Sequence, residues 1–284
     1  MKLFVTGGTG FVGTHFLQQA SARGHEIVAQ RRLGSQPRLP VANQLRWVDR
    51  PLDANFEDVL VGCDALVHLA SHTPNPPYAP LDECLYWNVY ASLKLARQAQ
   101  LSGISQFLVA GSCFEYGLAA ENQTFISTDT PLQPTLSYPT SKAAASVAFE
   151  GFARESMVKL KNLRIFQVYG EGEGEKRFWP SLRDAALAGR NFPMTKGEQV
   201  RDFITVEDVA RQFCEHLDFS NSIAGQPEVH HVASGQPQTL RAFAEFWWKQ
   251  WQATGRLQPG AVPYRHNEIM RLVPAVSQFE PRSD

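Results

Sequence analysis

Residues 1–13 of the sequence read Met1-Lys2-Leu3-Phe4-Val5-Thr6-Gly7-Gly8-Thr9-Gly10-Phe11-Val12-Gly13. The apolar run from Leu3 to Val5 is typical of a β-strand, and glycines follow it at once. From Thr14 to Arg23 the pattern becomes helical. The stretch therefore predicts a strand, a tight glycine turn and a helix, in that order.

The glycines of this turn indicate what it binds. They stand at positions 7, 10 and 13, and Gly8 adds a second reading of the loop as Gly-x-Gly-x-x-Gly. A side chain at these positions would block the turn, the approach of a pyrophosphate to backbone N–H groups, or packing of the helix on the strand. A glycine-rich surface turn is the alternative. The flanking strand and helix favour a dinucleotide-binding loop with contacts at Gly7, Thr9, Gly10, Phe11, Val12 and Gly13.

Length, composition and charge exclude several other classes of protein. The chain has 284 residues, of which 43% are apolar and 19% charged, as in ordinary globular proteins of one large domain or two lobes. A net charge of −1 provides no bulk attraction to nucleic acid or to an anionic membrane. The four cysteines form no Cys-x-x-Cys pair, and no apolar run approaches the ~18 residues of a membrane span. We therefore expect a reduced cytoplasmic protein with no metal site and no nucleic-acid or membrane partner.

Two arginines indicate which dinucleotide is bound. A second strand, predicted over 25–29, ends beside Arg31 and Arg32. In a dinucleotide-binding fold this end faces the adenosine ribose, where an acidic residue accepts from a 2′-hydroxyl and an arginine binds a 2′-phosphate. No Asp or Glu occurs between residues 27 and 37, so the sequence favours NADP(H) over NAD(H). The alternative is an exposed basic pair on a solvated loop.

Strands and helices continue to alternate after this point. Residues 45–48 read as a third strand leading to Asp49, a candidate partner of the adenine amino group. The apolar run 65–71 suits a parallel strand covered on both faces, and His68 within it is predicted to be a core histidine. A helical pattern over 86–102 and a strand over 106–110 follow. The alternation predicts an α/β protein with a Rossmann-type doubly wound parallel sheet.

Three polar residues carry candidate chemistry. Ser112 follows the strand over 106–110, and Tyr138 and Lys142 come 26 and 30 positions later. The last two are four apart, so on a helix they project from one face. A lysine ammonium beside a phenol lowers its pKa from about 10, which makes Tyr138 a usable proton donor and acceptor, with Ser112 on the same substrate oxygen. The alternative is an amphipathic helix whose Tyr and Lys face solvent.

With these motifs the sequence resembles the extended short-chain dehydrogenase/reductase family, in particular its nucleotide-sugar epimerases, dehydratases and ketoreductases. The likeness includes the glycine loop, Leu69-Ala70, Asn88, Ser112, Tyr138 and Lys142, then residues 164–170 and 201–209. It implies a dinucleotide-binding domain over 1–165, with some return of chain around 200–235, and a smaller C-terminal substrate-binding lobe over 166–284.

The resemblance also implies residue roles. Further cofactor contacts are implied at Leu69, Ala70, Ser71, Asn88, Tyr138, Lys142, Phe166 and Val168, and substrate contacts at Ser112, Gln167, Arg177 and Arg201. An arginine like Arg201 binds the diphosphate of a nucleotide sugar in that family, and a planar guanidinium suits such bidentate contacts. Relatives often form homodimers through the helices that match 86–102 and 138–156.

Departures from the family narrow the reaction. Its dehydratases carry Asp-Glu directly after the residue matching Ser112, where this chain has Cys113 and Phe114. Its epimerase-reductases for 3,5-epimerisation use Cys at the position of Phe114 and His at that of Gly172, and neither is present. Neither dehydration nor 3,5-epimerisation is therefore expected. Cys113 is interpreted as a small buried apolar residue.

Three functional readings remain. Arg31 favours an NADPH-dependent reductase of a 4-keto(-6-deoxy) nucleotide sugar, a step of deoxysugar biosynthesis. Residues 262–265 and 267–271 agree, because they resemble the C-terminal segment of bacterial 4-keto-6-deoxy nucleotide-sugar reductases. A nucleotide-sugar 4-epimerase with tightly bound NAD is the first alternative. A non-catalytic NADP(H)-binding sensor is the second, although a sensor has no use for Ser112, Tyr138 and Lys142 in register.

Overall fold

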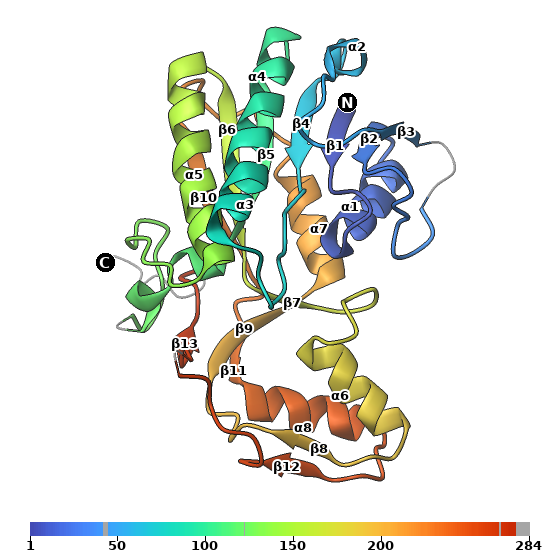
Figure 1. Ribbon diagram of the computed structural model, residues 1–284, viewed down its shortest axis with the longest axis vertical. Helices are drawn as coiled ribbons and strands as arrows, with labels where there is room; N and C mark the ends of the chain where they lie inside the picture. The colour runs from blue at the N-terminus through green and yellow to red at the C-terminus, as the bar shows by residue number, and fades with distance from the viewer. Residues whose placement is uncertain (42–44, 122, 267, 277–284) are drawn as a thin grey trace.

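The computed structural model describes residues 1–41, 45–121, 123–266 and 268–276. Figure 1 shows a central sheet with α3, α4 and α5 over one face and α1 and α7 over the other, above a smaller lobe that contains α6 and α8. The strands are β1 Lys2–Thr6, β2 Glu26–Arg31, β3 Arg46–Asp49, β4 Ala65–His68, β5 Gln106–Ser112, β6 Lys159–Ile165, β7 Gln167–Tyr169, β8 Phe192–Met194, β9 Val200–Thr205, β10 Glu228–Val232, β11 Pro237–Thr239, β12 Leu257–Pro259 and β13 Arg271–Leu272. The helices are α1 Phe11–Ala22, α2 Glu57–Leu60, α3 Leu81–Leu85, α4 Ser92–Leu101, α5 Ser137–Ser156, α6 Phe178–Leu187, α7 Val206–Glu215 and α8 Leu240–Gln250.

The predicted Rossmann-type sheet is confirmed. Seven strands pair in the order β10-β6-β5-β4-β1-β2-β3, and every pairing is parallel. The order reverses between β1 and β4, which lie side by side although the chain visits β2 and β3 between them. In doubly wound sheets ligands bind outside the carboxyl ends of the strands at this reversal.

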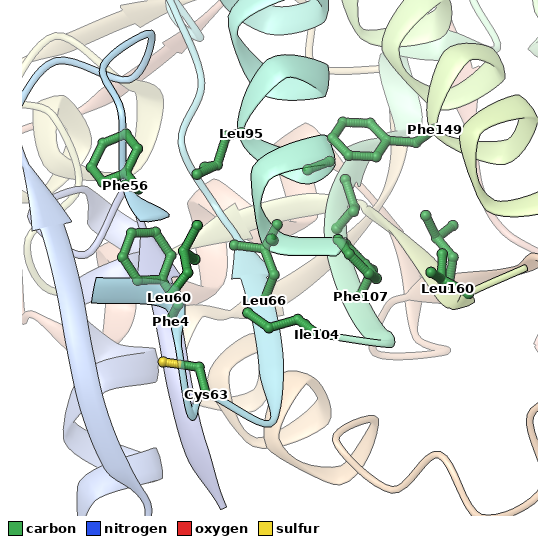
Figure 2. Close-up of a cluster of buried hydrophobic side chains, with 14 of the residues drawn as sticks. Phe4, Phe56, Leu60, Cys63, Leu66, Leu95, Ile104, Phe107, Phe149 and Leu160 are labelled. Carbon is green, nitrogen blue, oxygen red and sulfur yellow. The ribbon is translucent and has the colours of Figure 1, made fainter. Parts of the chain in front are cut away.

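Alternation along β1 explains how its apolar run supplies two cores. Leu3 and Val5 face one side, where they pack with residues of α1 and α7. Phe4 faces the other side, in a cluster that includes Leu95 of α4 and Phe149 of α5, as Figure 2 shows. Because both faces are buried, a continuous apolar run is the pattern that such a strand needs.

Two predicted elements have different limits. The helix expected over 86–102 begins at Leu81, after Pro80, and continues through a π-helical segment at Tyr86–Ala91 into α4. The strand expected over 65–71 ends at His68. His68 is a core histidine as predicted, because its Nδ1 and Nε2 lie 2.8 and 3.0 Å from the hydroxyls of Thr6 and Ser92. Burial lowers its pKa to about 3, so the ring is neutral.

The smaller lobe is held by aromatic packing. Between α6 and α8, the ring of Trp179 contacts Trp247 and Trp251 at centroid distances of 5.7 and 5.6 Å. Phe203 of β9 stacks on Phe243 of α8 at 4.0 Å.

The chain returns to the large sheet at β10, which pairs with β6. The domain limits at 165 and 166 stay a prediction. None of the helices in the described ranges is long and apolar enough to cross a membrane.

Candidate active site

A cavity of about 1010 Å³ lies along the carboxyl ends of β1, β4 and β5. It is at the point where the strand order reverses, as the sheet topology requires. Its lining includes every predicted cofactor contact except Asp49. These residues are Gly7, Thr9, Gly10, Phe11, Val12, Gly13, Arg31, Arg32, Leu69, Ala70, Ser71, Asn88, Tyr138, Lys142, Phe166 and Val168.

The glycine loop forms a cradle that side chains would fill. Gly7 has a φ of +72°, and a Cβ there would lie 2.5 Å from the backbone N of Ala70. A Cβ at Gly13 would lie 2.0 Å from the carbonyl oxygen of Gly7. The Gly10 N–H donates to that same oxygen at 2.9 Å and closes the turn before α1. A backbone this open, leading to a helix N-terminus, fits the pyrophosphate of a dinucleotide.

At the end of the cavity beside β2, Arg31 forms a pair that the sequence did not reveal. The Arg31 Nε donates to Asp49 Oδ1 at 2.7 Å, and its guanidinium lies 4.9 Å from the centre of the Trp47 ring. The register of β2 and β3 sets Arg31 directly opposite Asp49. The carboxylate of Asp49 is therefore engaged by arginine, and its predicted contact with adenine stays a prediction. Arg32 lines the cavity with an exposed side chain.

The three predicted catalytic residues meet in this cavity. Ser112 ends β5, Tyr138 and Lys142 lie in the first turns of α5, and all three are buried. The Ser112 Oγ accepts from the Phe114 N–H at 3.3 Å, so its own proton is available for a ligand oxygen. Near the phenol, the ring of Tyr78 lies 5.4 Å from that of Tyr138, centre to centre. Tyr78 was not among the predicted site residues. An aromatic residue in a proline-rich loop directly after β4 could have marked it as a residue near the site.

One expectation about this group is wrong. Burial raises the pKa of Tyr138 above its ordinary value, against a lowering by a hydrogen bond from Ser71. The Lys142 ammonium donates to the Ala110 carbonyl oxygen at 2.6 Å, so this hydrogen bond is to the backbone and not to the phenol. Burial also lowers the pKa of Lys142 itself. Tyr138 is thus a neutral phenol at neutral pH, the form that donates a proton.

A buried network of hydrogen bonds fixes the position of Ser112. The Glu115 side chain accepts from the Ser112 backbone N–H at 2.7 Å, from the Ser146 hydroxyl at 2.7 Å and from Arg164 Nε at 3.0 Å. Arg164 also donates to the Tyr116 hydroxyl at 2.8 Å, and that hydroxyl lies 2.6 Å from His231 Nε2. Sequence reasoning missed this network because its members come from β5, α5, β6 and β10.

Asn88 links the loop after β4 to α5. Its Oδ1 accepts from the His72 N–H at 2.7 Å, and its Nδ2 donates to the Ser141 hydroxyl at 2.9 Å. Asn88 belongs to the π-helical segment, and such segments occur frequently at functional sites. The implied cofactor contact is compatible with this position, since Asn88 lines the cavity.

A second cavity of about 1190 Å³ adjoins the first and reaches into the smaller lobe. Both are lined by Gln167 and Arg177, which were predicted substrate contacts, and by Arg38 and Glu173, which were not. Arg201 lines only the second cavity. The shared lining places the two cavities side by side.

Arg201 is buried and engaged by the C-terminal segment. Its guanidinium donates to the carbonyl oxygens of Val200, at 2.9 Å, and Ile269, and lies 3.5 Å from the Glu268 carboxylate. Burial lowers its pKa below the ordinary arginine value. The resemblance over 267–271 thus falls on a segment that Arg201 anchors, except Asn267, which lies outside the described residues.

Four cysteines occur in the described ranges, all buried and unpaired. Cys113 is a buried apolar residue as predicted, and burial raises its pKa to about 12. Among the described residues no group of three or more His, Cys, Asp or Glu is placed to hold a metal ion.

A doubly wound sheet, a glycine cradle before a helix and a Ser-Tyr-Lys set at one cavity together define a dinucleotide-binding protein of the short-chain dehydrogenase/reductase type. The chain belongs to the NAD dependent epimerase/dehydratase family, which it matches over residues 3–229. It is therefore a member of a family of enzymes that modify nucleotide sugars.

Similar proteins are known by sequence and by structure. UDP-glucose 4-epimerase of Corynebacterium glutamicum is 25% identical over 272 residues, 86% of this chain and 79% of that protein. The dTDP-6-deoxy-L-talose 4-dehydrogenase (NAD(+)) of Aggregatibacter actinomycetemcomitans is 24% identical over 253 residues, 86% of this chain and 88% of that protein. The solved structure of MoeE5 in complex with UDP-glucuronic acid and NAD has a TM-score of 0.82 at 25% identity, and covers 98% of this chain and 91% of that one. The likeness supports dependence on NAD or NADP.

Proposed function

We propose that this protein is an NADPH-dependent reductase of a 4-keto(-6-deoxy) nucleotide sugar. The observation that carries the proposal is the buried phenol of Tyr138, which lies with the Ser112 hydroxyl at a cavity that adjoins a second one. Reduction of a carbonyl needs a proton donor at its oxygen, and a raised pKa keeps that donor protonated. The name of the talose 4-dehydrogenase relative supports redox chemistry at C4.

Each residue has a distinct task in this proposal. The bound nicotinamide supplies a hydride to the C4 carbonyl carbon. Tyr138 gives its proton to the carbonyl oxygen, while the Ser112 hydroxyl donates a hydrogen bond to the same oxygen. Lys142 exchanges the Ala110 carbonyl for the nicotinamide ribose. The glycine cradle holds the pyrophosphate, and Arg31 and Arg32 hold the 2′-phosphate.

A nucleotide-sugar 4-epimerase with bound NAD is the second candidate. The pairing of Arg31 with Asp49 favours it, because the carboxylate neutralises part of the charge that a 2′-phosphate would use. The name of the epimerase relative points the same way. Dehydration is disfavoured, since a buried Cys113 thiol and Phe114 offer neither an acid nor a base.

The deciding assay is a screen of 4-keto sugars linked to CDP, dTDP, GDP and UDP. A reductase consumes NADPH with one of them. An epimerase interconverts hydroxyl epimers without net consumption, and a sensor protein shows no turnover.

We further propose that the protein is a cytoplasmic homodimer whose interface is formed by the helical segments 86–102 and 138–156 of each protomer. Support comes from exposed apolar side chains on them, since Tyr90 and Val147 are 60% and 62% exposed. Light scattering on the purified protein measures the oligomeric state, and a monomer at all concentrations contradicts the proposed dimer.

Arg31→Ala is expected to weaken NADPH binding about 10- to 150-fold, the roughly 1.5–3 kcal/mol of a charge-assisted contact. NADH binding should change little, because NADH has no 2′-phosphate. Calorimetric titration with both dinucleotides measures the two affinities. Arg46→Ala is the matched control, since Arg46 lies on the same edge of the sheet outside the cavity lining. NADH binding as tight as NADPH binding in the unmodified protein would contradict the assignment.

Arg201→Ala is expected to raise KM for the nucleotide sugar about 10- to 150-fold, because a diphosphate loses a charged donor. Steady-state kinetics measures KM, and titration checks that NADPH affinity is unchanged. Glu268→Gln tests whether Arg201 binds the diphosphate or only anchors the C-terminal segment, because it removes the carboxylate that pairs with Arg201. If Arg201 only anchors the C-terminal segment, Glu268→Gln raises KM as well.

A further inference from the structure

The loop between β7 and α6 carries an acidic residue that neither the predicted chemistry nor the resemblance uses. Residues 170–175 alternate Gly and Glu, and Glu173 is the one whose side chain is buried, with 6% exposed. Among the described residues that line the first cavity, Glu173 is the only acid. It also lines the second cavity.

The surroundings of the loop place it over the phosphate-binding end of the site. The Glu171 carbonyl oxygen lies 2.8 Å from His15 Nε2 on α1. The Gly172 carbonyl oxygen accepts from Arg38 at 3.0 Å. Gly174, on the other side of Glu173, faces the Asn75 side chain in the loop after β4. The loop therefore bridges the two sides of the cleft beside the first turns of α1.

The carboxyl of Glu173 is only half satisfied. Oε1 lies 3.4 Å from Arg177 Nε, a long contact. Oε2 is buried and has no hydrogen-bond partner in the described part of the chain. A buried polar oxygen without a partner destabilises the free protein, so a ligand that satisfies it gains affinity.

The proposed ligands carry several negative charges. These charges determine whether Glu173 contacts the ligand as an ionised or as a protonated carboxyl. An ionised Glu173 repels phosphate at short range in a buried site. A neutral carboxylic acid instead has an O–H donor for a phosphate oxygen. We propose that Glu173 is a ligand-contacting residue whose protonated Oε2 donates to a phosphate oxygen of the dinucleotide or of the nucleotide sugar, and that binding takes up one proton from solvent.

The electrostatics of the loop allow this protonation near neutral pH. Burial raises the pKa of Glu173 to about 7, while Arg177, a hydrogen bond with the backbone of Gly170 and the charge of Arg38 act to lower it. Other titratable groups of the packed elements are His15 on α1, beside Glu207, and Arg183 on α6, which binds Glu171. Across the second cavity lie Glu175, Lys176, Arg265 and Glu268.

The inference rests on the proposed ligands but not on the reaction, so binding alone tests it. Calorimetric titration at pH 8.0, in buffers of different ionisation enthalpy, counts the protons taken up. At this pH phosphate monoesters with a pKa near 6 stay ionised. One arm uses NADPH; the other uses CDP-, dTDP-, GDP- and UDP-glucose. Uptake by the unmodified protein in either arm identifies which phosphate Glu173 contacts.

Glu173→Gln is the deciding variant, because its amide N–H can still donate to a phosphate oxygen but the side chain cannot ionise. We expect no proton uptake in this variant, and an affinity that is flat from pH 7 to 8.5. The unmodified protein should lose affinity up to tenfold per pH unit above pH 7. Glu173→Gln should therefore bind up to about tenfold more tightly at pH 8.

Two controls isolate the residue. Glu171→Gln changes an exposed carboxyl of the same loop that lines neither cavity, and should behave like the unmodified protein. His15→Gln tests whether the imidazole is the group that titrates. Nucleotide binding without proton uptake, or uptake that survives in Glu173→Gln, overturns the inference and leaves the proposed function intact. Failure of every nucleotide to bind overturns both.

Discussion

Tyr138→Phe is expected to lower the single-turnover rate of NADPH oxidation by a 4-keto-6-deoxy nucleotide sugar roughly 10²- to 10⁴-fold, the usual contribution of a positioned proton donor. The variant loses one hydroxyl, so NADPH affinity should be nearly unchanged. Rapid mixing of the NADPH complex with the keto sugar measures the rate of the chemical step without product release.

Tyr86→Phe is the matched control for this variant. It removes a phenol hydroxyl that donates to Asp53 and lines neither cavity, so it should leave the rate close to that of the unmodified protein. Because burial raises the pKa of Tyr138, the rate should stay flat as pH rises through the neutral range, where the phenol remains protonated. Equal rates in Tyr138→Phe and the unmodified protein would remove Tyr138 as the proton donor.

Arg164→Met is expected to lower the free energy of unfolding by about 3–5 kcal/mol, the cost of leaving one partner of a buried ion pair alone. The side chains of Arg164 and Glu115 are 4% and 0% exposed. The midpoint of urea unfolding measures the loss. Arg50→Met is the control, because the Arg50 pair with Asp58 is 36% and 57% exposed and exposed pairs contribute little to the free energy of unfolding.

The pH dependence of Arg164→Met gives a second readout. Burial raises the pKa of Glu115, and Arg164 opposes that rise. Without Arg164 the folded-state pKa of Glu115 rises further above its unfolded value. A raised carboxyl pKa destabilises the folded state as pH rises, so the deficit should shrink as pH falls toward 4.5. A deficit that does not depend on pH would show that lost packing, not the uncompensated carboxylate, causes it.

The sequence predicts the features that are local along the chain. The glycine turn, the parallel strands and the spacing of Tyr138 and Lys142 are all patterns within a few residues, and the structure gathers them at one cavity. Long-range contacts had no such signal. The pairing of Arg31 with Asp49 depends on strand register, and the direction of the Tyr138 pKa shift depends on the depth of burial.

The place of β10 has a consequence for synthesis of the chain on the ribosome. The edge of the large sheet at β6 is completed only by β10, whose first residue follows the end of β6 by the whole segment 166–227. At about 5–20 residues per second, that segment takes roughly 3–12 s to make. Phe16 of α1 waits longer, because Phe213 of α7, whose ring centre lies 6.4 Å from its own, is made 197 residues later. While residues 166–227 are made, the nascent chain exposes the unpaired edge of β6, and until α7 is made it exposes the apolar side chains of α1 that pack on α7, which is when it most needs a chaperone.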